Sequence, residues 1–304
     1  LTITTTDIES GIRTANKCEV ASPGKVCVPG KPLFDAVRSM ADGDIVMKLS
    51  PANMRMQITA GHTTVSLACM MADDFPAWID GESSGEKGES NASASIDPKA
   101  FARSLDSALF AASSDESRYN LNGIFFEQES GGSSESSESL DPPASSESAP
   151  SVSLSIIATD GHRLTRRSLP FNLSLGFKAI IPKDGAIDLK RLLDNCTENV
   201  TISFTSKNVI LSVSDGKLVA TMRLVAGEYP NYRKVIPEGD GTRIIIDRES
   251  LLATVKRVSF LVTERNKGIN LDIRNGELTI SAFHPDLGMA TDKIEGIDYT
   301  GEPI

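Results

Sequence analysis

The sequence repeats itself, and this self-similarity constrains the fold more than any other feature. Three segments, 1–7, 154–160 and 278–284, alternate Leu, Ile or Thr with other residues and then reach a polar turn. Alternation with a period of two residues is typical of half-buried strands. Because self-similarity along a chain indicates a repeated structural unit, we predict one module used three times.

Two longer matches join the three copies. Residues 28–38 align with 181–191 at an offset of 153, and both carry an apolar residue, Pro, Asp and Arg at the same spacing. Residues 96–112 align with 246–262 at an offset of 150, and their apolar residues recur at i, i+4, i+7 and i+11, which is one face of a helix. The module is therefore predicted to be α+β, with two helices packed on antiparallel sheets.

The copies divide the chain into three predicted domains of unequal completeness. A partial first domain covers 1–80, a linker 81–95, a complete middle domain 96–237 and a partial third domain 238–304. The first copy lacks the opening helix and strand of the module, and the third stops before its second helix. Both ends of a longer protein are therefore expected to be absent from this chain.

Residues 129–150 form a low-complexity insertion in the predicted middle domain. They contain five acidic residues, no Lys or Arg and a single Leu. Such a composition cannot bury enough apolar surface to offset the entropy of ordering, so a disordered surface loop is expected. Without these residues the net charge of −10 becomes −5. A second hypothesis is that the Ser/Glu loop is a phosphorylation or recruitment site.

Composition argues against several classes of protein. The 304 residues are 39% hydrophobic and 24% charged, which is typical of globular proteins. No stretch of 18 apolar residues and no signal-peptide layout at the start is present, so a cytoplasmic rather than a membrane or secreted protein is expected. Four cysteines without a C-x-x-C pair and only three histidines argue against a zinc site or a disulfide scaffold. We expect no metal and no cofactor.

Lys and Arg gather on the predicted helices, whereas Asp and Glu gather in loops. This distribution in an acidic protein suggests one surface that binds a polyanion. The alternative is an ordinary solvated helix face of mixed charge. The helical cations that carry the polyanion hypothesis are Lys31, Arg38, Lys99, Arg103, Lys183, Lys190, Arg191, Arg248, Lys256, Arg257, Arg265 and Lys267.

The string Thr159-Asp160-Gly161-His162-Arg163-Leu164 follows one of the predicted strands. Asp and Gly favour a chain reversal there, because Gly adopts positive φ without strain. Asp160 and His162, with His284, also allow a hydrolase hypothesis. No Ser or Cys nucleophile motif accompanies these residues, so a structural turn is favoured over catalysis.

Four strings, taken in order, resemble the bacterial sliding clamp family, the beta subunits of the replicative DNA polymerase. They are Arg118 to Gly123, Ala158 to Leu164, Ile181 to Lys183 and Tyr229 to Pro237. The resemblance covers the chain apart from its low-complexity stretches. It implies the DNA-clamp fold: a ring of two head-to-tail protomers whose helices line a hole around duplex DNA. Such a clamp confers processivity and has no active site of its own.

The resemblance also implies two sets of functional residues. A pocket would receive short linear peptides with apolar and Gln side chains from the polymerase catalytic subunit, the clamp loader and repair polymerases. The pocket residues are Leu121, Thr159, Gly161, His162, Arg163, Leu164, Pro230, Lys234, Val235 and Asn266. The DNA-facing residues are Lys31, Arg38, Arg103, Arg118, Lys183, Lys190, Arg191, Lys256 and Arg257.

Three departures from the family pattern bear on these expectations. Asn266 stands where relatives can have an aromatic residue, and Lys234 stands where Arg is commoner, so the affinity of the pocket is expected to differ. Asp184 follows Lys183 where relatives often have a second basic residue. The 129–150 insertion is expected to project from a strand connection, outside the hole, because acidic groups would repel phosphates.

Two other functions remain open from the sequence. One is a hydrolase centred on Asp160 and His162, and the other is a repeat scaffold that binds only proteins. Head-to-tail contacts are expected to need the absent ends, so this chain alone is not expected to close a ring.

Overall fold

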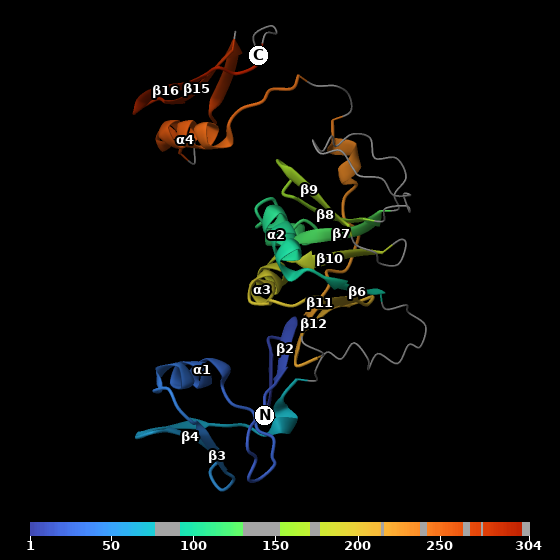
Figure 1. Ribbon diagram of the computed structural model, residues 1–304, viewed down its shortest axis with the longest axis vertical. Helices are drawn as coiled ribbons and strands as arrows, with labels where there is room; N and C mark the ends of the chain where they lie inside the picture. The colour runs from blue at the N-terminus through green and yellow to red at the C-terminus, as the bar shows by residue number, and fades with distance from the viewer. Residues whose placement is uncertain are drawn as a thin grey trace. The chain divides into compact units, whose positions relative to one another are not determined.

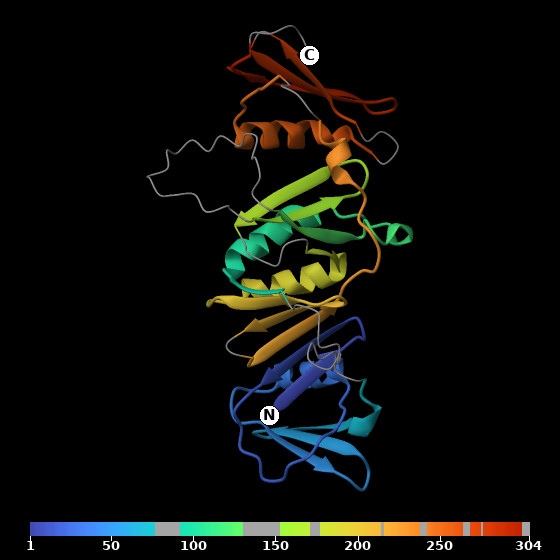
Figure 2. The same ribbon diagram turned by 90° about the vertical axis from the view of Figure 1, so that its right-hand side faces the viewer.

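The computed structural model of the chain contains two compact units, residues 1–230 and 231–304 (Figures 1 and 2). No helix in the described part of either unit is both long and apolar enough to cross a lipid bilayer. The described residues are 1–76, 92–129, 153–170, 177–213, 216–237, 242–263, 268–274 and 276–299.

The first unit alternates strands and short helices, as a repeated module requires. The predicted strands at 1–7 and 154–160 are confirmed as β1 and β8. The elements are β1 (Thr2–Thr6), β2 (Ser10–Ala15), α1 (Gly30–Ser39), β3 (Val46–Ser50), β4 (Arg55–Ala60), β5 (Thr63–Ala68), η1 (Ala72–Asp74), β6 (Ala92–Ile96), α2 (Pro98–Leu109), η2 (Glu116–Arg118), β7 (Gly123–Glu129), β8 (Ser153–Thr159), β9 (Leu164–Pro170), β10 (Lys178–Pro182), α3 (Lys183–Asp194), β11 (Val200–Phe204), β12 (Asn208–Val213) and β13 (Leu218–Arg223).

Antiparallel sheets form the framework of this unit. One sheet has the order β1-β2-β13-β12-β11-β6, a second has the order β10-β7-β8-β9, and a third has the order β3-β4-β5. In the first of these, β2 pairs with β13, from Ser10 opposite Met222 to Thr14 opposite Leu218. Strands of the first copy thus continue a sheet of the middle copy, a pairing that the repeat pattern alone did not predict.

The predicted linker at 81–95 is wrong at its C-terminal end. Residues 92–95 belong to β6, which pairs with β11. Small residues suggested a linker, but Ala94 is partly buried and packs against the core. Residues 81–91 lie outside the described residues, as does the predicted insertion at 129–150 apart from Glu129, the last residue of β7.

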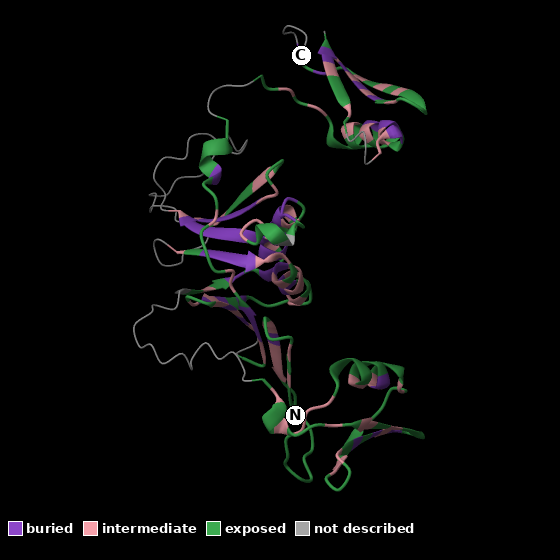
Figure 3. Cartoon of the chain, turned by 180° about the vertical axis from the view of Figure 1, so that it is seen from behind, coloured by how far each residue is buried: buried purple, intermediate pink, exposed green. Residues whose placement is uncertain are grey.

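The core of the middle copy lies between its sheets and the helices α2 and α3, which contact each other (Figure 1). Pro98 occupies the first turn of α2, and the preceding Asp97 caps it by accepting a hydrogen bond from the backbone N–H of Lys99. The predicted apolar stripe of α2 is confirmed, because Phe101 and Leu105 are fully buried. Buried residues also fill most of β7, as the purple strands of the middle copy show (Figure 3). Burial of such side chains stabilises a fold by about 1.5–3 kcal/mol each.

The match between residues 28–38 and 181–191 is confirmed in the structure. These segments form α1 and α3, and each helix starts directly after a proline, Pro29 or Pro182. The ladders that follow also correspond, since β3-β4-β5 and β11-β12-β13 are both antiparallel meanders.

The second unit contains the third copy of the module. Its helix α4 packs on a sheet of order β14-β15-β16, and the predicted strand at 278–284 is confirmed within β15. Asp247 caps α4 by accepting from the backbone N–H of Ser250. The unit begins at Asn231, before the predicted domain boundary at 237. Its elements are η3 (Tyr232–Val235), α4 (Arg248–Val258), η4 (Ser259–Leu261), β14 (Asn270–Arg274), β15 (Glu277–His284) and β16 (Gly288–Glu295).

Candidate peptide site and nucleic-acid interface

The turn between β8 and β9 is built by local hydrogen bonds. Gly161 has a φ of 92°, the left-handed region that glycine adopts without strain, as predicted from the sequence. The Thr159 hydroxyl accepts from the backbone N–H of Gly161 at 3.1 Å and donates to the carbonyl oxygen of Arg163 at 2.7 Å. Thr159 also pairs with Leu164 across the hairpin. The turn therefore presents His162 and Arg163 to solvent on a defined backbone.

Asp160 is the central acceptor of this turn. One carboxylate oxygen accepts from the backbone N–H groups of His162 (2.9 Å) and Arg163 (3.1 Å), and the other accepts from Nε of Arg163 (2.9 Å). These bonds, led by the one from the His162 backbone, lower the pKa of Asp160 to about 2. The carboxylate is therefore ionised and engaged in structure, and the hydrolase hypothesis is not supported.

One further pocket prediction, Leu121, lies in the same unit. Leu121 is half-buried and follows η2, where its backbone N–H donates to the carbonyl oxygen of Arg118 at 2.8 Å. The Arg118 side chain reaches the turn, since its Nη1 would lie 3.5 Å from a Cβ added at Gly161. Arg118 was predicted to face DNA. The structure places its side chain beside the turn, with Asp115 at 3.6 Å as its ion-pair partner, and its role toward DNA stays a prediction.

Two residues near this site were not predicted as members of it. The Tyr229 ring stacks on Phe125 at 4.7 Å with an interplanar angle of 2°, and burial raises its pKa to about 12. The Asn120 amide donates to the carbonyl oxygen of Glu228 at 2.9 Å. These contacts hold the chain before Pro230 against β7. Both residues lie in strings that carried the family resemblance, but the hydrogen bond and the stacking join residues about 100 positions apart.

The remaining pocket predictions fall elsewhere. Pro230 is exposed and ends the first unit, whereas Lys234 and Val235 are exposed in η3 of the second unit. Asn266 lies outside the described residues. Of these predicted pocket residues, the structure brings together the turn residues Thr159, Gly161, His162, Arg163 and Leu164.

The predicted DNA-facing residues divide into two groups by their partners. One group is exposed and has no ion-pair partner among the described residues; we call it the unpaired helix cations. On α1 two of its members lie one i, i+7 step apart, so they share a face of the helix. The unpaired helix cations are Lys31, Arg38, Arg103 and Lys256.

The second group is held by acidic or backbone acceptors. Lys190 contacts Asp106 at 3.0 Å and Asp194 at 3.8 Å, and the bond to Asp106 raises its pKa. Arg191 pairs with Asp188 at 3.0 Å. These charges are partly compensated before any polyanion approaches.

Lys183 has a structural role that its sequence did not reveal. Its ammonium group donates to the Ala112 carbonyl oxygen at 3.1 Å and to the Ser114 hydroxyl at 2.8 Å. It thereby ties the start of α3 to the segment after α2. The Ala112 acceptor is a main-chain carbonyl, so no pattern of side chains could have indicated that bond.

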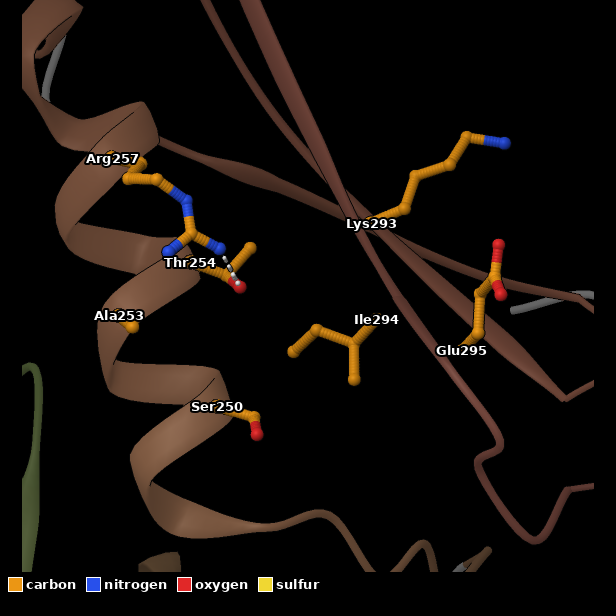
Figure 4. A pocket seen from close by; sticks show the side chains of 7 residues that line it. All are labelled: Ser250, Ala253, Thr254, Arg257, Lys293, Ile294 and Glu295. Carbon is orange, nitrogen blue, oxygen red and sulfur yellow. Dashed lines mark hydrogen bonds between the residues drawn. The ribbon is translucent and has the colours of Figure 1, made fainter.

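In the second unit, Arg257 lines a hollow of about 390 Å³ between α4 and β16 (Figure 4). Its guanidinium donates to the Thr254 hydroxyl at 2.9 Å and to Asp292 at 2.6 Å. The bond from Arg257 lowers the pKa of Asp292. Arg257 therefore joins α4 to the sheet.

Comparison with known proteins agrees with this architecture. Models of the DNA polymerase III beta subunit match the chain in three parts: the N-terminal domain at residues 1–79, the central domain at 146–231 and the C-terminal domain at 233–304. The beta sliding clamp of Escherichia coli K12 is 28% identical over 304 residues, which cover 99% of this chain and 74% of that protein. The beta sliding clamp of Caulobacter vibrioides is 26% identical over 308 residues, covering 100% and 75% respectively.

Solved structures show the same fold. The sliding clamp of Bartonella birtlesii, bound to griselimycin, has a TM-score of 0.83 at 28% identity and covers 100% of this chain with 74% of its own. The DNA polymerase III beta subunit of Pseudomonas aeruginosa has a TM-score of 0.82 at 27% identity, with coverages of 100% and 75%. The predicted DNA-clamp fold is thus confirmed, and the chain belongs to the DNA polymerase III beta subunit family, the beta sliding clamps.

Proposed function

We propose that the chain encircles duplex DNA without reading its sequence and tethers replication and repair proteins to it, and that it acts in the cytoplasm without an active site. The observation that carries this proposal is the distribution of charge. The helices α1 to α4 hold ten Lys and Arg residues against six Asp and Glu, whereas the whole chain holds 31 against 41. A positive helical surface on an acidic protein suits a polyanion.

The presence of both unpaired and carboxylate-bonded cations on the helices suits a protein that slides along DNA. Contacts to phosphates carry no sequence information, so a clamp needs positive charge that does not bind any base pair tightly. The unpaired helix cations supply the attraction. Lys190 and Arg191 are already bonded to carboxylates, so they add a weaker, diffuse field.

Topological retention on circular DNA tests the proposal directly. The 304-residue chain, incubated with a clamp loader and nicked plasmid, should stay on the plasmid through gel filtration in 0.5 M salt. Cutting the plasmid should release it. A scaffold that binds only proteins would not co-elute with the plasmid, and a protein held by charge alone would leave at high salt before the cut.

Substitutions test the role of the unpaired helix cations. Lys31→Gln with Lys256→Gln should weaken DNA binding and lower the slope of log affinity against log salt by about 0.9 for each phosphate that is no longer neutralised. Arg191→Gln is the matched control, because this guanidinium is already paired with Asp188. Equal effects of the paired and unpaired cations would contradict the division.

Inside the first unit, a strand of the first module copy pairs with a strand of the middle copy, and this pairing is the pattern for the contact that we propose between two protomers. There β2 pairs with β13, with Ile12 opposite Ala220. The hairpin β15–β16 of the third copy corresponds to the hairpin β1–β2 of the first copy. The meander β3-β4-β5 of the first copy corresponds to the meander β11-β12-β13 of the middle copy. Within their sheets, β16 and β5 are edge strands. We therefore propose that β16 of one protomer pairs with β5 of a second, head to tail.

The repeat also sets the register of this seam. Ala290 occupies the same place in the β15–β16 pairing as Ile12 does in the β1–β2 pairing. Val65 occupies the same place in the β4–β5 pairing as Ala220 does in the β12–β13 pairing. The seam therefore pairs Val65 with Ala290 of the second protomer. Both seam strands lie in the present chain, so we now propose, against the expectation from the sequence, that it self-associates.

Cysteine cross-linking tests the register. The next rung pairs Ser66 with Met289, and both side chains are exposed. In a Cys18→Ser background, which removes the exposed native thiol, Ser66→Cys with Met289→Cys should form an intermolecular disulfide on oxidation. Ser66→Cys with Thr291→Cys is the control, because a shift of two residues separates the thiols beyond bonding distance. Faster cross-linking of the control would overturn the register.

The site at the β8–β9 turn is proposed to receive partner peptides. Its first-unit part consists of Leu121, the turn residues 159–164 and Pro230, with Arg118 beside it. Such a site of strand-end and loop residues, with a few fixed polar groups, suits a short linear motif. Lys234 and Val235 in the second unit, and Asn266, stay pocket predictions from the family resemblance. The partners would be the polymerase catalytic subunit, the clamp loader and repair polymerases.

A further inference from the structure

Phe110 is an exposed aromatic residue in the middle copy of the module. It caps the C-terminus of α2 and is 58% exposed, whereas Phe101 on the same helix is 1% exposed. A single exposed aromatic residue is common in proteins. This one is covered by a specific group, because the Arg163 guanidinium carbon lies 5.4 Å from the centre of its ring.

Arg163 is restrained on two sides. Its Nε donates to Asp160 at 2.9 Å, and one side of its guanidinium meets the Phe110 ring. Cation–π contacts of this kind contribute about 0.5–1 kcal/mol at exposed sites. The side chain is 57% exposed, and its terminal amino groups make no hydrogen bond to the described residues. The terminal N–H groups are therefore oriented and available as donors.

The spacing between Phe110 and Arg163 is fixed by the elements that carry them. The Thr165 hydroxyl on β9 donates to the carbonyl oxygen of Ser107, in the last turn of α2, at 3.1 Å. This bond ties the helix end to the strand that follows the turn. The bond therefore holds the C-terminal end of α2, which carries Phe110, close to the start of β9, which follows Arg163.

The charges at this point favour an uncharged acceptor. Asp160 is ionised and already compensates Arg163. A second carboxylate on the partner would approach Asp160 and be repelled, whereas a carbonyl oxygen would not.

We propose that Phe110 is a positioning residue of the peptide site. Its ring holds Arg163 so that the terminal N–H groups donate to a neutral carbonyl oxygen of the partner peptide, from its backbone or a Gln side chain. This inference rests on the proposed peptide-binding function and adds a residue outside the predicted pocket.

A double-mutant cycle on the full chain tests the proposal. The probe is a fluorescein-labelled six-residue peptide with one Gln and otherwise Leu, Ser and Phe, followed by anisotropy. Phe110→Ala should weaken binding about 5-fold, Arg163→Gln about 10-fold, and the two together no more than Arg163→Gln alone, because the ring acts through the guanidinium. Phe110→Trp should restore binding to within about 2-fold, since Trp also stacks on Arg.

The matched control is Phe34→Ala, which removes an exposed Phe that also lies under a guanidinium, that of Arg38 at 5.8 Å, on another helix. It should leave peptide affinity unchanged. Independent, additive effects of Phe110→Ala and Arg163→Gln would overturn the positioning role. Binding that falls 10-fold between 50 and 200 mM salt, or that tightens when the peptide Gln becomes Glu, would overturn the neutral acceptor.

A peptide-free measurement separates this inference from the proposed function. In the NMR spectrum, the ring current of Phe110 should shift the Arg163 Hδ signals upfield, and Phe110→Ala should abolish that shift. Loss of the shift together with unchanged peptide affinity would overturn the positioning role while the peptide site stands. A wild-type chain that binds no such peptide would overturn both.

Discussion

The β8–β9 and β15–β16 turns occupy the same position in two copies of the module, yet their chemistry differs. In the first, Asp160 accepts from two backbone N–H groups of the turn. In the second, Nδ1 of His284 does the same work, accepting from the backbone N–H of Asp286 at 3.2 Å and of Leu287 at 3.3 Å. Both turns are therefore ordered from within by a side-chain acceptor.

Their outward side chains differ most. The β8–β9 turn exposes His162 and Arg163. At the β15–β16 turn, Leu287 is 66% exposed, and Phe283 and Met289 in the adjoining strand ends are 56% and 70% exposed. The repeat thus fixes the backbone, and the residues at the tip decide what the turn can bind. A polar turn with oriented donors suits a peptide, and an apolar turn beside an open strand suits a second protein surface.

The largest expected effect comes from making the apolar turn polar. In the proposed seam, Leu287 and Met289 adjoin β5 of a second protomer, near the exposed Met70 and Met71. Burying each apolar side chain contributes about 1.5–3 kcal/mol, so Leu287→Asp with Met289→Asp should weaken self-association by about 100-fold or more. Sedimentation equilibrium measures this change. Peptide affinity should stay as in wild type, and a parallel loss of it would contradict the division of roles.

The converse change acts on the polar turn. Asp160→Ala removes the acceptor of three hydrogen bonds, each of which contributes about 0.5–1.5 kcal/mol, so peptide affinity should fall about 10-fold. Self-association should not change. Asp160→Asn is the control, because its amide oxygen keeps one acceptor and should recover part of the affinity. Weaker self-association in either variant would show that the two turns are coupled.

This comparison also shows what the sequence could predict. The buried stripe of Phe101 and Leu105, and the strands that end in each turn, follow from period and composition, because local geometry fixes which side chains face the core. The Gly161 reversal follows from the freedom of glycine. These features depend on neighbours within a few residues.

The features that the sequence did not predict depend on distant partners. Lys183 resembled a DNA contact, but its ammonium group donates to the Ala112 carbonyl oxygen and the Ser114 hydroxyl after α2. Arg118 also resembled a DNA contact, and the structure places its guanidinium beside Gly161. The β2–β13 pairing joins strands about 200 residues apart. A residue type indicates which bonds a side chain can make, and only the folded chain decides which acceptor lies within reach.

The pH dependence of the polar turn sharpens the comparison further. The pKa of Asp160 is lowered to about 2 from its ordinary 3.8, so the ionised form is the one that the fold favours. The turn's hydrogen bonds are then fully present above pH 4 and are lost as the pH falls through about 2. Peptide affinity should therefore be constant from pH 7 to 4 with respect to this group and fall below that, as anisotropy would show. A loss centred at pH 4 would mean that Asp160 is not held by the turn.

The smallest expected effects come from the glycines at the two tips. Gly161 and Gly288 both have positive φ, 92° and 105°, so alanine at either position costs about 1–2 kcal/mol of backbone strain. A Cβ at Gly288 meets nothing within 4 Å, whereas one at Gly161 lies 3.5 Å from Arg118. Both Ala variants should lower the free energy of unfolding by similar amounts in urea. Only Gly161→Ala should also weaken peptide binding, by about 2- to 3-fold, because its methyl group borders the side chains that receive the peptide. Equal peptide affinity in the two variants would place the binding surface away from Gly161 and Arg118.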